Sequence, residues 1–390
     1  MRPVSVVHII TKLELGGAQQ NTLFTVAHLD RDRFRTYLVT NPEGILVPEA
    51  RAIEGVKTFF ISELIREINP LIDIRALFKI KSILQGIKKG DTPIIVHTHS
   101  SKAGILGRWG ARLARADAII HTIHGFGFHD YQPLPIKGFL FFLEKVTARI
   151  TDMFIAVSKA NIKKGVDNGI FTKQKTSLIR SGIEVEAFTR VKVKRAEKKK
   201  SLGVEPDLPL VTMIGCLKPQ KAPLDYLEVA HQVLQEREAH FILVGDGALR
   251  EKVEKKAVQL GLGERFKLLG WRRDIPEILA ATDIFCLTSL WEGLPRVLPQ
   301  AMAMGIPIVA TDVDGTPEAV IHNVNGFITK PRDTKAMAKR IIYLLDHPQE
   351  AKMMGKQGKK MVREFDIRRM VREQEDLYLQ LLRKKGRGIQ

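Results

Sequence analysis

The chain alternates between short continuous apolar runs and longer segments whose apolar residues recur at helical spacing. The first pattern predicts buried parallel strands, and the second predicts helices that cover them. The predicted strands are Val4–Ile10, Tyr37–Thr40, Thr58–Phe60, Ile94–His97, Ala118–Thr122, Met153–Val157, Thr176–Ile179, Leu210–Ile214, His240–Val244, Phe266–Leu269, Ile284–Leu287 and Pro307–Ala310. The predicted helices are Gln19–His28, Asp73–Lys88, Ser101–Ala114, Pro135–Ile150, Lys159–Asn168, Pro223–Gln235, Leu249–Leu260, Asp274–Ala281, Val297–Met304, Thr334–Leu345 and Arg368–Lys385. We therefore expect an α/β protein with two Rossmann-like, doubly wound parallel-sheet domains in tandem.

A polar segment divides the two blocks. Residues 186–209 are rich in lysine and contain Pro206 and Pro209, which is typical of an inter-domain linker. We expect an N-terminal domain over residues 1–185 and a C-terminal domain over residues 210–365. Residues 366–390 are predicted to form a final helix that packs back on the N-terminal domain.

Length and composition fit a soluble two-domain protein of 390 residues. The two cysteines lie far apart in apolar runs, so a reducing compartment is expected. We find no secretory leader and no apolar run long enough to span a bilayer, and therefore expect a cytoplasmic protein. The net charge of +19, most of it in residues 1–200, favours polyanions, anionic lipid surfaces or phosphorylated substrates without choosing among them.

The stretch from Ser289 to Gly305 is the most informative part of the sequence. Glu292 stands in a turn after an apolar strand, and Gln300 follows inside a predicted helix. The carboxyl ends of parallel strands are where open α/β sheets bind ligands. Carboxylate and amide side chains both hold hydroxyl groups, as recognition of sugar and ribose requires.

This stretch resembles the family 4 retaining glycosyltransferases, which show Ser-x-x-Glu-Gly-x-Pro-x-x-x-x-Glu-Ala-Met-x-x-Gly. The resemblance implies the GT-B fold, in which two Rossmann-like domains face each other across a cleft. It implies that Glu292 positions hydroxyls of the donor sugar and that Gln300, which replaces the family's second glutamate, contacts the ribose. The intervening residues Gly293, Leu294 and Pro295 are expected to bind the donor as well.

The first predicted strand leads into the turn Leu13-Glu-Leu-Gly-Gly-Ala-Gln19. Gly16 and Gly17 let backbone N–H groups approach a diphosphate, and the following helix points its positive end there. The turn lacks the dinucleotide fingerprint and the P-loop lysine. It is similar to the family's Gly-Gly-Ala-Glu loop, with Gln19 in place of the glutamate.

Histidines gather around His121-Thr-Ile-His-Gly-Phe-Gly-Phe-His129 and around His97 and His99. The resemblance assigns His124 to the donor sugar or its leaving phosphate. No carboxylate or cysteine completes a zinc set at recognised spacing, so we expect no metal site. For His97 and His99 we favour structural hydrogen bonds at a strand end.

The second block begins with Gly215-Cys-Leu-Lys-Pro-Gln-Lys-Ala222, where the family has Gly-Arg-Leu-x-x-x-Lys-Gly. Lys221 matches the family lysine that clamps the diphosphate. Cys216 stands at the arginine position and supplies no charge, so Lys218 is a candidate to supply it, with simple solvation as the equal alternative.

Three further turns complete the set of motifs. Gly245, in Val244-Gly-Asp-Gly, matches a family turn that shapes the nucleotide pocket. Leu269 and Gly270, after the next strand, are expected to place backbone groups near the base. Asp314-Gly-Thr-Pro-Glu318 matches the family's Gly-Gly-x-Pro-Glu, with a less defined role.

The resemblance implies a metal-independent, retaining hexosyltransferase that needs no cofactor. Negative charge growing on the diphosphate meets helix N-termini and Lys221. The run His97-Thr-His-Ser-Ser-Lys-Ala-Gly104 resembles the cell-envelope branch, which builds capsular, O-antigen or other lipid-linked glycans. The expected partners are a nucleotide-sugar donor, UDP-linked by preference, a lipid-linked or polysaccharide acceptor, and an anionic membrane surface on the inner face of the cytoplasmic membrane, with no nucleic acid.

Two other functions stay open at this point. One is a UDP-sugar epimerase on the same scaffold, and the other is a non-catalytic protein that binds polyanions through its basic half. An oxidoreductase is not favoured because the dinucleotide fingerprint is missing. The aromatic segment around Phe139, Phe142 and Leu143 fits either a helix lying on a membrane or the protein core, and we favour the core.

Overall fold

The computed structural model describes residues 3–88, 90 and 92–387. The chain divides into two compact units. The N-terminal unit runs to Gly182 and takes in the last stretch, from Ile367 on, while the C-terminal unit comprises Ile183–Asp366. The prediction of two parallel, doubly wound α/β sheets is confirmed, since one unit has a seven-stranded sheet and the other a six-stranded sheet.

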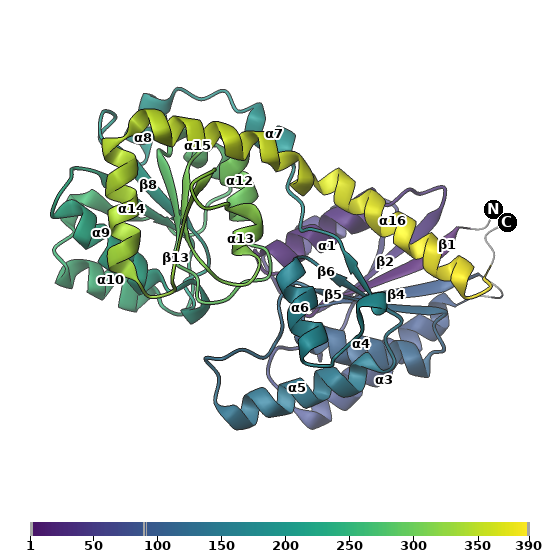
Figure 1. Ribbon diagram of the computed structural model, residues 1–390. Helices are drawn as coiled ribbons and strands as arrows, with labels where there is room; N and C mark the ends of the chain where they lie inside the picture. Colours follow the sequence, from purple (N-terminus) through teal and green to yellow (C-terminus); the bar gives the residue numbers. More distant parts are fainter. Residues whose placement is uncertain (1–2, 89, 91, 388–390) are drawn as a thin grey trace. The chain divides into compact units, whose positions relative to one another are not determined.

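The sheet of the N-terminal unit has the order β3-β2-β1-β4-β5-β6-β7, and all its strands run parallel. Its strands are β1 (Val4–Ile9), β2 (Phe34–Thr40), β3 (Lys57–Phe60), β4 (Ile94–His99), β5 (Ala118–Ile123), β6 (Met153–Ala156) and β7 (Thr176–Leu178). Its helices are α1 (Gly17–His28), α2 (Val47–Ala52), α3 (Pro70–Ile87), α4 (Ser101–Leu113), α5 (Leu134–Ala148), α6 (Lys159–Asp167) and α16 (Ile367–Lys384). Because the strand order reverses between β1 and β4, loops splay apart at that point and leave room for a ligand. Helices α3, α4 and α5 cover one face of the sheet, and α1 and α16 lie on the other (Figure 1).

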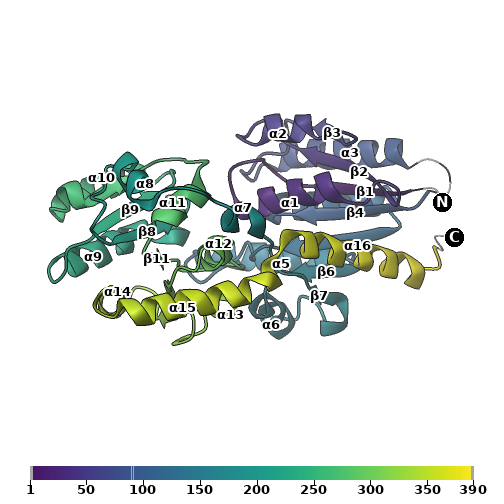
Figure 2. The ribbon, with the colours of Figure 1, turned by 90° about the horizontal axis from the view of Figure 1, so that it is seen from above.

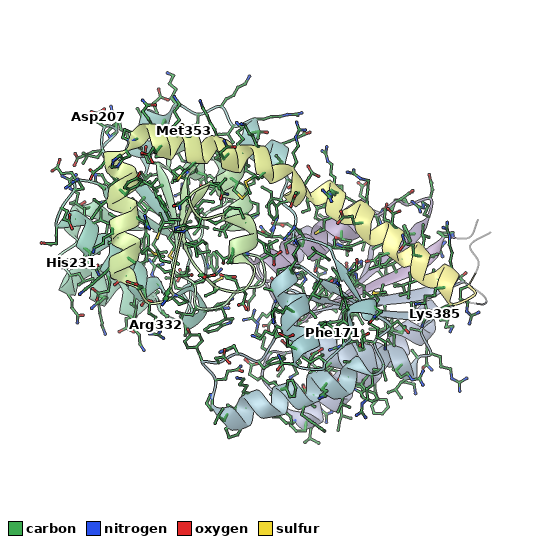
Figure 3. The ribbon with its side chains drawn as sticks, in the orientation of Figure 1. Phe171, Asp207, His231, Arg332, Met353 and Lys385 are labelled. Carbon is green, nitrogen blue, oxygen red and sulfur yellow. The ribbon has the colours of Figure 1, made fainter. Side chains whose placement is uncertain are left out.

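Helix α16 completes the N-terminal unit although it follows the whole C-terminal unit in sequence. It runs beside α1 (Figure 2). Its buried side chains, which join residues of β1, β4 and β5 in one hydrophobic cluster, are Ile367, Met370, Val371, Leu377, Tyr378, Leu379, Leu381 and Leu382. Just beyond its end, Lys385 (labelled in Figure 3) forms a 2.7 Å ion pair with Asp152. Both ends of the chain therefore build the same hydrophobic core.

The sheet of the C-terminal unit has the order β10-β9-β8-β11-β12-β13, again parallel throughout. Its strands are β8 (Leu210–Ile214), β9 (His240–Val244), β10 (Phe266–Leu268), β11 (Ile284–Leu287), β12 (Ile308–Thr311) and β13 (Gly326–Thr329). Its helices are α7 (Val185–Thr189), α8 (Arg195–Ser201), α9 (Pro223–Leu234), α10 (Arg250–Gln259), α11 (Ile275–Ala281), α12 (Val297–Ala303), α13 (Thr316–Ala319), α14 (Thr334–Asp346) and α15 (Pro348–Met361). The strand order reverses between β8 and β11, which makes that point the expected ligand site of this unit.

Residues 186–209, expected as a basic linker, carry helix α8 and most of α7 and pack on the C-terminal unit. Lys199 is buried, lies 3.1 Å from a carboxylate oxygen of Asp283 and donates a 2.6 Å hydrogen bond to the carbonyl of Leu208. Lys198 pairs with Asp274 at 2.5 Å. The lysines here neutralise acidic side chains of their own unit, which composition alone does not reveal.

On helix α5, two aromatic side chains that we expected in the core are exposed. Phe139 and Phe142 are 48% and 61% exposed, so that expectation is wrong for both. The reason is that apolar residues surround the helix, and only one side of it can face the sheet; Leu140 and Phe141 take that side. Within residues 3–88, 90 and 92–387, no helix is both long enough and apolar enough to cross a membrane.

Candidate functional site

At the switch point of the C-terminal sheet, a lysine and a glutamate form an ion pair. The Lys221 ammonium, in the loop after β8, contacts Oε1 of Glu292, in the loop after β11. The hydroxyl of Ser289 donates a 2.7 Å hydrogen bond to the same oxygen. The two charged side chains are only 17% and 7% exposed, so they are largely shielded from water. A fixed, partly dry carboxylate of this kind suits recognition of ligand hydroxyls.

The backbone around Glu292 is held from the two strands that flank β11, which are β8 and β12. The Glu292 N–H donates a 2.7 Å hydrogen bond to Oδ2 of Asp314, which follows β12. The Thr311 hydroxyl donates to the carbonyl of Ser289 at 2.5 Å, and the Leu290 N–H donates to the carbonyl of Gln220 at 2.7 Å. Sequence reasoning missed the supporting role of Ser289, although it stands only three positions before Glu292, and treated Asp314 only as a turn residue, because that contact joins residues 22 positions apart.

Lys221 is itself positioned by its loop. It ends the 3₁₀ turn Pro219–Lys221, and Ala222 follows in the left-handed conformation with φ 44° before α9 begins. The Thr288 hydroxyl donates to the Lys221 carbonyl at 2.8 Å. An ammonium group has three N–H donors. Lys221 is therefore able to keep its bond to Glu292 and still donate to a phosphate oxygen.

A layer of glycines lies beside this pair. The Gly245 N–H donates a 2.8 Å hydrogen bond to the carbonyl of Gly270, which joins the turns after β9 and β10. Gly245 has φ 137°, and a Cβ there would collide with the carbonyl oxygen of Gly215. Leu269 is half-buried next to Gly270. The structure thus brings together the turns that we assigned to the nucleotide. Because the Gly215 carbonyl lies so close, position 245 must be glycine.

The remaining candidates of the C-terminal unit surround α12. Gly293, Leu294 and Pro295 are buried in the turn before the helix, while Gln300 is half-buried on it. Lys218 is half-buried as well, and its backbone N–H donates to the Cys216 carbonyl at 2.8 Å.

In the N-terminal unit, Gly16 and Gly17 open helix α1. Gly16 is its N-cap, with extended backbone at φ −161°, and Gly17 is exposed. The first turn contains no acidic side chain. Gln19 folds back over the turn, and its side-chain amide donates to the Lys12 carbonyl at 3.3 Å. The helix N-terminus therefore keeps the positive end that an anionic group favours.

His124, directly after β5, belongs to a row of hydrogen-bonded histidines. Its Nε2 lies 3.2 Å from Nδ1 of His99, and Nε2 of His99 lies 3.0 Å from Nδ1 of His8. His124 is half-buried, whereas His8 and His99 are buried. Sequence reasoning missed His8, although a histidine inside an otherwise apolar strand was a signal. Burial lowers the pKa of His8 to about 3 and lowers the pKa of His99 well below its usual range.

His97 has different partners. Its Nδ1 lies 2.5 Å from the hydroxyl of Tyr378 on α16, and its Nε2 lies 2.6 Å from the hydroxyl of Thr122. One ligand atom each of His8, His97 and His99 lies within 4.8 Å of the others. Both nitrogens of His97 form hydrogen bonds, and so does each nitrogen of His99. These are the structural hydrogen bonds that we expected for His97 and His99.

The candidate residues thus fall into two groups. Gly16, Gly17 and His124 belong to the N-terminal unit, and the others belong to the C-terminal unit. That both groups serve one donor stays a prediction.

Two doubly wound parallel sheets, each with a glycine turn and polar side chains at the carboxyl edge of its switch point, are the architecture of the GT-B fold, which nucleotide-sugar transferases use. The HepE protein of Anabaena, solved in complex with UDP and glucose, has this fold. It superposes on the chain with a TM-score of 0.80, covering 96% of this chain and 99% of its own, at 21% sequence identity.

The chain belongs to the glycosyltransferase family that matches it in two parts: "Glycosyltransferase Family 4" over residues 15–187 and "Glycosyl transferases group 1" over residues 194–361. An Escherichia coli relative, UDP-Gal:alpha-D-GlcNAc-diphosphoundecaprenol alpha-1,3-galactosyltransferase, is 31% identical and covers 97% of both chains. A Campylobacter jejuni relative, N,N'-diacetylbacillosaminyl-diphospho-undecaprenol alpha-1,3-N-acetylgalactosaminyltransferase, is 24% identical over 77% of this chain and 81% of its own. The protein is therefore a glycosyltransferase, as the resemblance in its motifs predicted.

Proposed function

We propose that this glycosyltransferase moves a hexosyl group from a UDP-sugar to a hydroxyl of a sugar that is linked through diphosphate to undecaprenol, as a step in cell-envelope glycan synthesis. The names of both curated relatives describe transfer to a diphosphoundecaprenol-linked sugar. The donor named for the Escherichia coli enzyme is a UDP-sugar, and the HepE structure contains UDP. Neither an epimerase nor a non-catalytic binder has comparable support.

The observation that carries the proposal is the Lys221–Glu292 ion pair beside Ser289. In our proposal the Glu292 carboxylate accepts hydrogen bonds from donor sugar hydroxyls, and the Lys221 ammonium donates to the diphosphate. A double-displacement mechanism uses two carboxylates about 5 Å apart, and our proposal gives Glu292 no such partner role. Glu292 then acts as a positioning group for the donor and forms no covalent bond to it.

The reaction that we propose retains the configuration of the anomeric carbon. The acceptor oxygen attacks the anomeric carbon on the face from which the diphosphate leaves. The bond between that carbon and the β-phosphate oxygen breaks, and the proton of the acceptor hydroxyl passes to the leaving phosphate. Lys221 supplies positive charge to this phosphate, so we propose that the reaction needs no divalent metal.

The acceptor's lipid calls for a surface that lies against a membrane, and we propose the outer side of α3 and α5. Both helices cover the same face of the N-terminal sheet (Figure 1). Their exposed apolar side chains include Leu71 (74%), Phe78 (55%), Leu134 (81%), Phe139 (48%) and Phe142 (61%). The same helices carry the exposed basic side chains of Arg75, Lys79 and Lys145. Apolar side chains bordered by basic groups fit the headgroup region of an anionic membrane.

The experiment is a transfer assay with the purified full-length chain. UDP-galactose, UDP-glucose and UDP-N-acetylglucosamine are each offered with N-acetylglucosamine-diphosphate linked to a polyprenol, with and without EDTA. We expect a disaccharide product with one of the donors, in the α configuration and insensitive to EDTA. Each donor is also incubated without acceptor, and conversion of the sugar in that mixture would favour the epimerase instead. Transfer that stops with EDTA would overturn metal independence alone.

A further inference from the structure

The row of three histidines in the N-terminal unit runs from the half-buried His124 into the interior. His8 lies on β1 and His99 on the neighbouring strand β4, and the planes of their rings differ by only 9°. Their ring centroids are 5.3 Å apart, while the facing nitrogens are 3.0 Å apart. Nearly parallel rings at that separation meet edge to edge, which is the arrangement for an N–H···N hydrogen bond in the ring plane.

The two inner rings of the row, His8 and His99, are neutral when the protein is folded. Both inner rings are buried, and burial holds the pKa of His8 at about 3 and the pKa of His99 well below its usual range. A neutral imidazole carries one N–H and one acceptor nitrogen. Each inner ring must therefore carry a proton on one nitrogen and a lone pair on the other, and their mutual hydrogen bond leaves only two proton arrangements for the pair.

The inner end of the row distinguishes the two arrangements. Among the described residues, Nε2 of His8 is buried and has no hydrogen-bond partner. In one arrangement this nitrogen carries a proton and a buried N–H is left unsatisfied; in the other it carries only a lone pair. Orphaned buried N–H groups are rarer in proteins than under-used acceptors, which favours the second arrangement.

In the favoured arrangement every donor points outward. His8 donates from Nδ1 to Nε2 of His99, and His99 donates from Nδ1 to Nε2 of His124. His124 then holds its own proton on Nδ1. His97 does not disturb this order, because its nitrogens contact the hydroxyls of Tyr378 and Thr122.

We propose that His8 and His99 are positioning residues that fix His124 in the Nδ1–H tautomer, so that it meets the donor as a neutral hydrogen-bond donor. This proposal rests on the proposed function for the identity of the ligand, an oxygen of the donor sugar or of its leaving phosphate. The tautomer itself is a property of the free protein. His124 is then unable to act as a base through Nδ1.

The test is the tautomer of His124, read from two-bond ¹H–¹⁵N correlations in histidine-labelled full-length protein without substrate. The His124 signals are assigned by their loss in His124→Gln. We expect Nδ1–H in the wild type. His8→Asn places an amide N–H near the position of Nδ1 and should keep the tautomer, whereas His8→Leu removes the donor and should populate Nε2–H. An Nε2–H tautomer in the wild type would overturn the proposal.

Kinetics give the second readout. If the row acts through His124, His8→Leu should lower kcat about tenfold with little change in KM, and His8→Asn should recover most of that loss. Equal kcat values for the two variants, with equal thermal stability, would contradict a positioning role. The purified protein should also be analysed for bound metal. A stoichiometric metal ion whose removal by chelation changes the tautomer would overturn the proposal, because the histidines would then form a metal site. A correct tautomer in a protein that transfers no sugar would sink the proposed function and leave the row intact.

Discussion

The Lys221 ammonium and the Glu292 carboxylate, 71 positions apart in sequence, form one ion pair across the switch point of the C-terminal sheet. If Lys221 also faces the leaving diphosphate, Lys221→Met should lower kcat about 10²- to 10³-fold, since that is the usual cost of losing one electrostatic donor. Steady-state kinetics with saturating UDP-sugar measure this effect.

The same pair makes a prediction for stability. Lys221→Met leaves the Glu292 carboxylate shielded from water without its cation, and should destabilise the C-terminal unit by about 1–3 kcal/mol in urea unfolding. The double variant Lys221→Met/Glu292→Gln should recover part of that loss, because no charge is then stranded. Lys252→Met, at an exposed lysine on α10, is the control and should change stability by less than about 0.5 kcal/mol. Additive effects of the two substitutions would show that the pair does not couple.

Gln300 offers a gain-of-affinity test. A charged acceptor makes a stronger hydrogen bond to a hydroxyl than an amide does, by about 1 kcal/mol. Gln300→Glu, which restores the family residue, should therefore tighten UDP binding about fivefold in calorimetry. Gln300→Leu should weaken it. A glutamate variant that binds UDP no better than the wild type would remove Gln300 from the ribose site.

Gly245 should not tolerate a side chain. Its φ of 137° strains any other residue, and a Cβ there would meet the Gly215 carbonyl oxygen. Gly245→Ala should cost at least about 2 kcal/mol of unfolding free energy in the C-terminal unit. Gly263→Ala is the matched control, since Gly263 has φ 50° with nothing within 4 Å of the added Cβ, and should cost about 1 kcal/mol. Similar losses in the two variants would show that the close approach to Gly215 is not limiting.

Acid should destabilise the protein through its buried histidines. His8 has a folded-state pKa of about 3, below the unfolded value of about 6.5, so below pH 6.5 the unfolded chain takes up a proton that the folded chain refuses. Between pH 7.5 and 5.5 this residue alone should remove about 1.4 kcal/mol. Urea titrations at both pH values should show His8→Asn losing less stability than the wild type by about that amount. An identical pH dependence would indicate that His8 is already protonated when folded.

The exposed aromatic residues of α5 are predicted to bind membranes. Replacing Phe139 and Phe142 together by serine should weaken binding to vesicles of anionic phospholipid about tenfold, since each ring is expected to bury part of its surface in the headgroup region. Val258→Ser, at an 82% exposed apolar residue of α10, is the control. Co-sedimentation with anionic and with neutral vesicles measures the effect. Unchanged binding of the double variant would move the membrane surface elsewhere.

Much of the fold could be predicted from the sequence because continuous apolar strands and amphipathic helices differ in period. Strand β13 escaped notice because its four residues begin with Gly326 and end with Thr329, so only two apolar residues stand in a row. Helix α15 was overlooked among lysines and glycines.

The site was predictable only where a motif names its residue. Glu292 and Lys221 stand in recognisable turns, and the structure brings them into contact. The motifs do not reveal which groups hold them. Asp314 contacts Glu292 because the strands before them are neighbours in the sheet, and Ser289 contacts it within the same loop. His8 reaches His124 only through His99, on a strand adjacent in the sheet but distant in sequence.

Helix α16 has a consequence for how the protein is made. The strands of the N-terminal sheet are synthesised first. Tyr378 and Leu382 cover one face of that sheet, but they are synthesised only after the whole C-terminal unit. Until then, apolar groups of β1, β4 and β5 stay open to water, where half-made chains are prone to stick to one another. The N-terminal unit is thus translated first, but its hydrophobic core is completed last. Nascent chains that stall before Ile367 should therefore depend on chaperones.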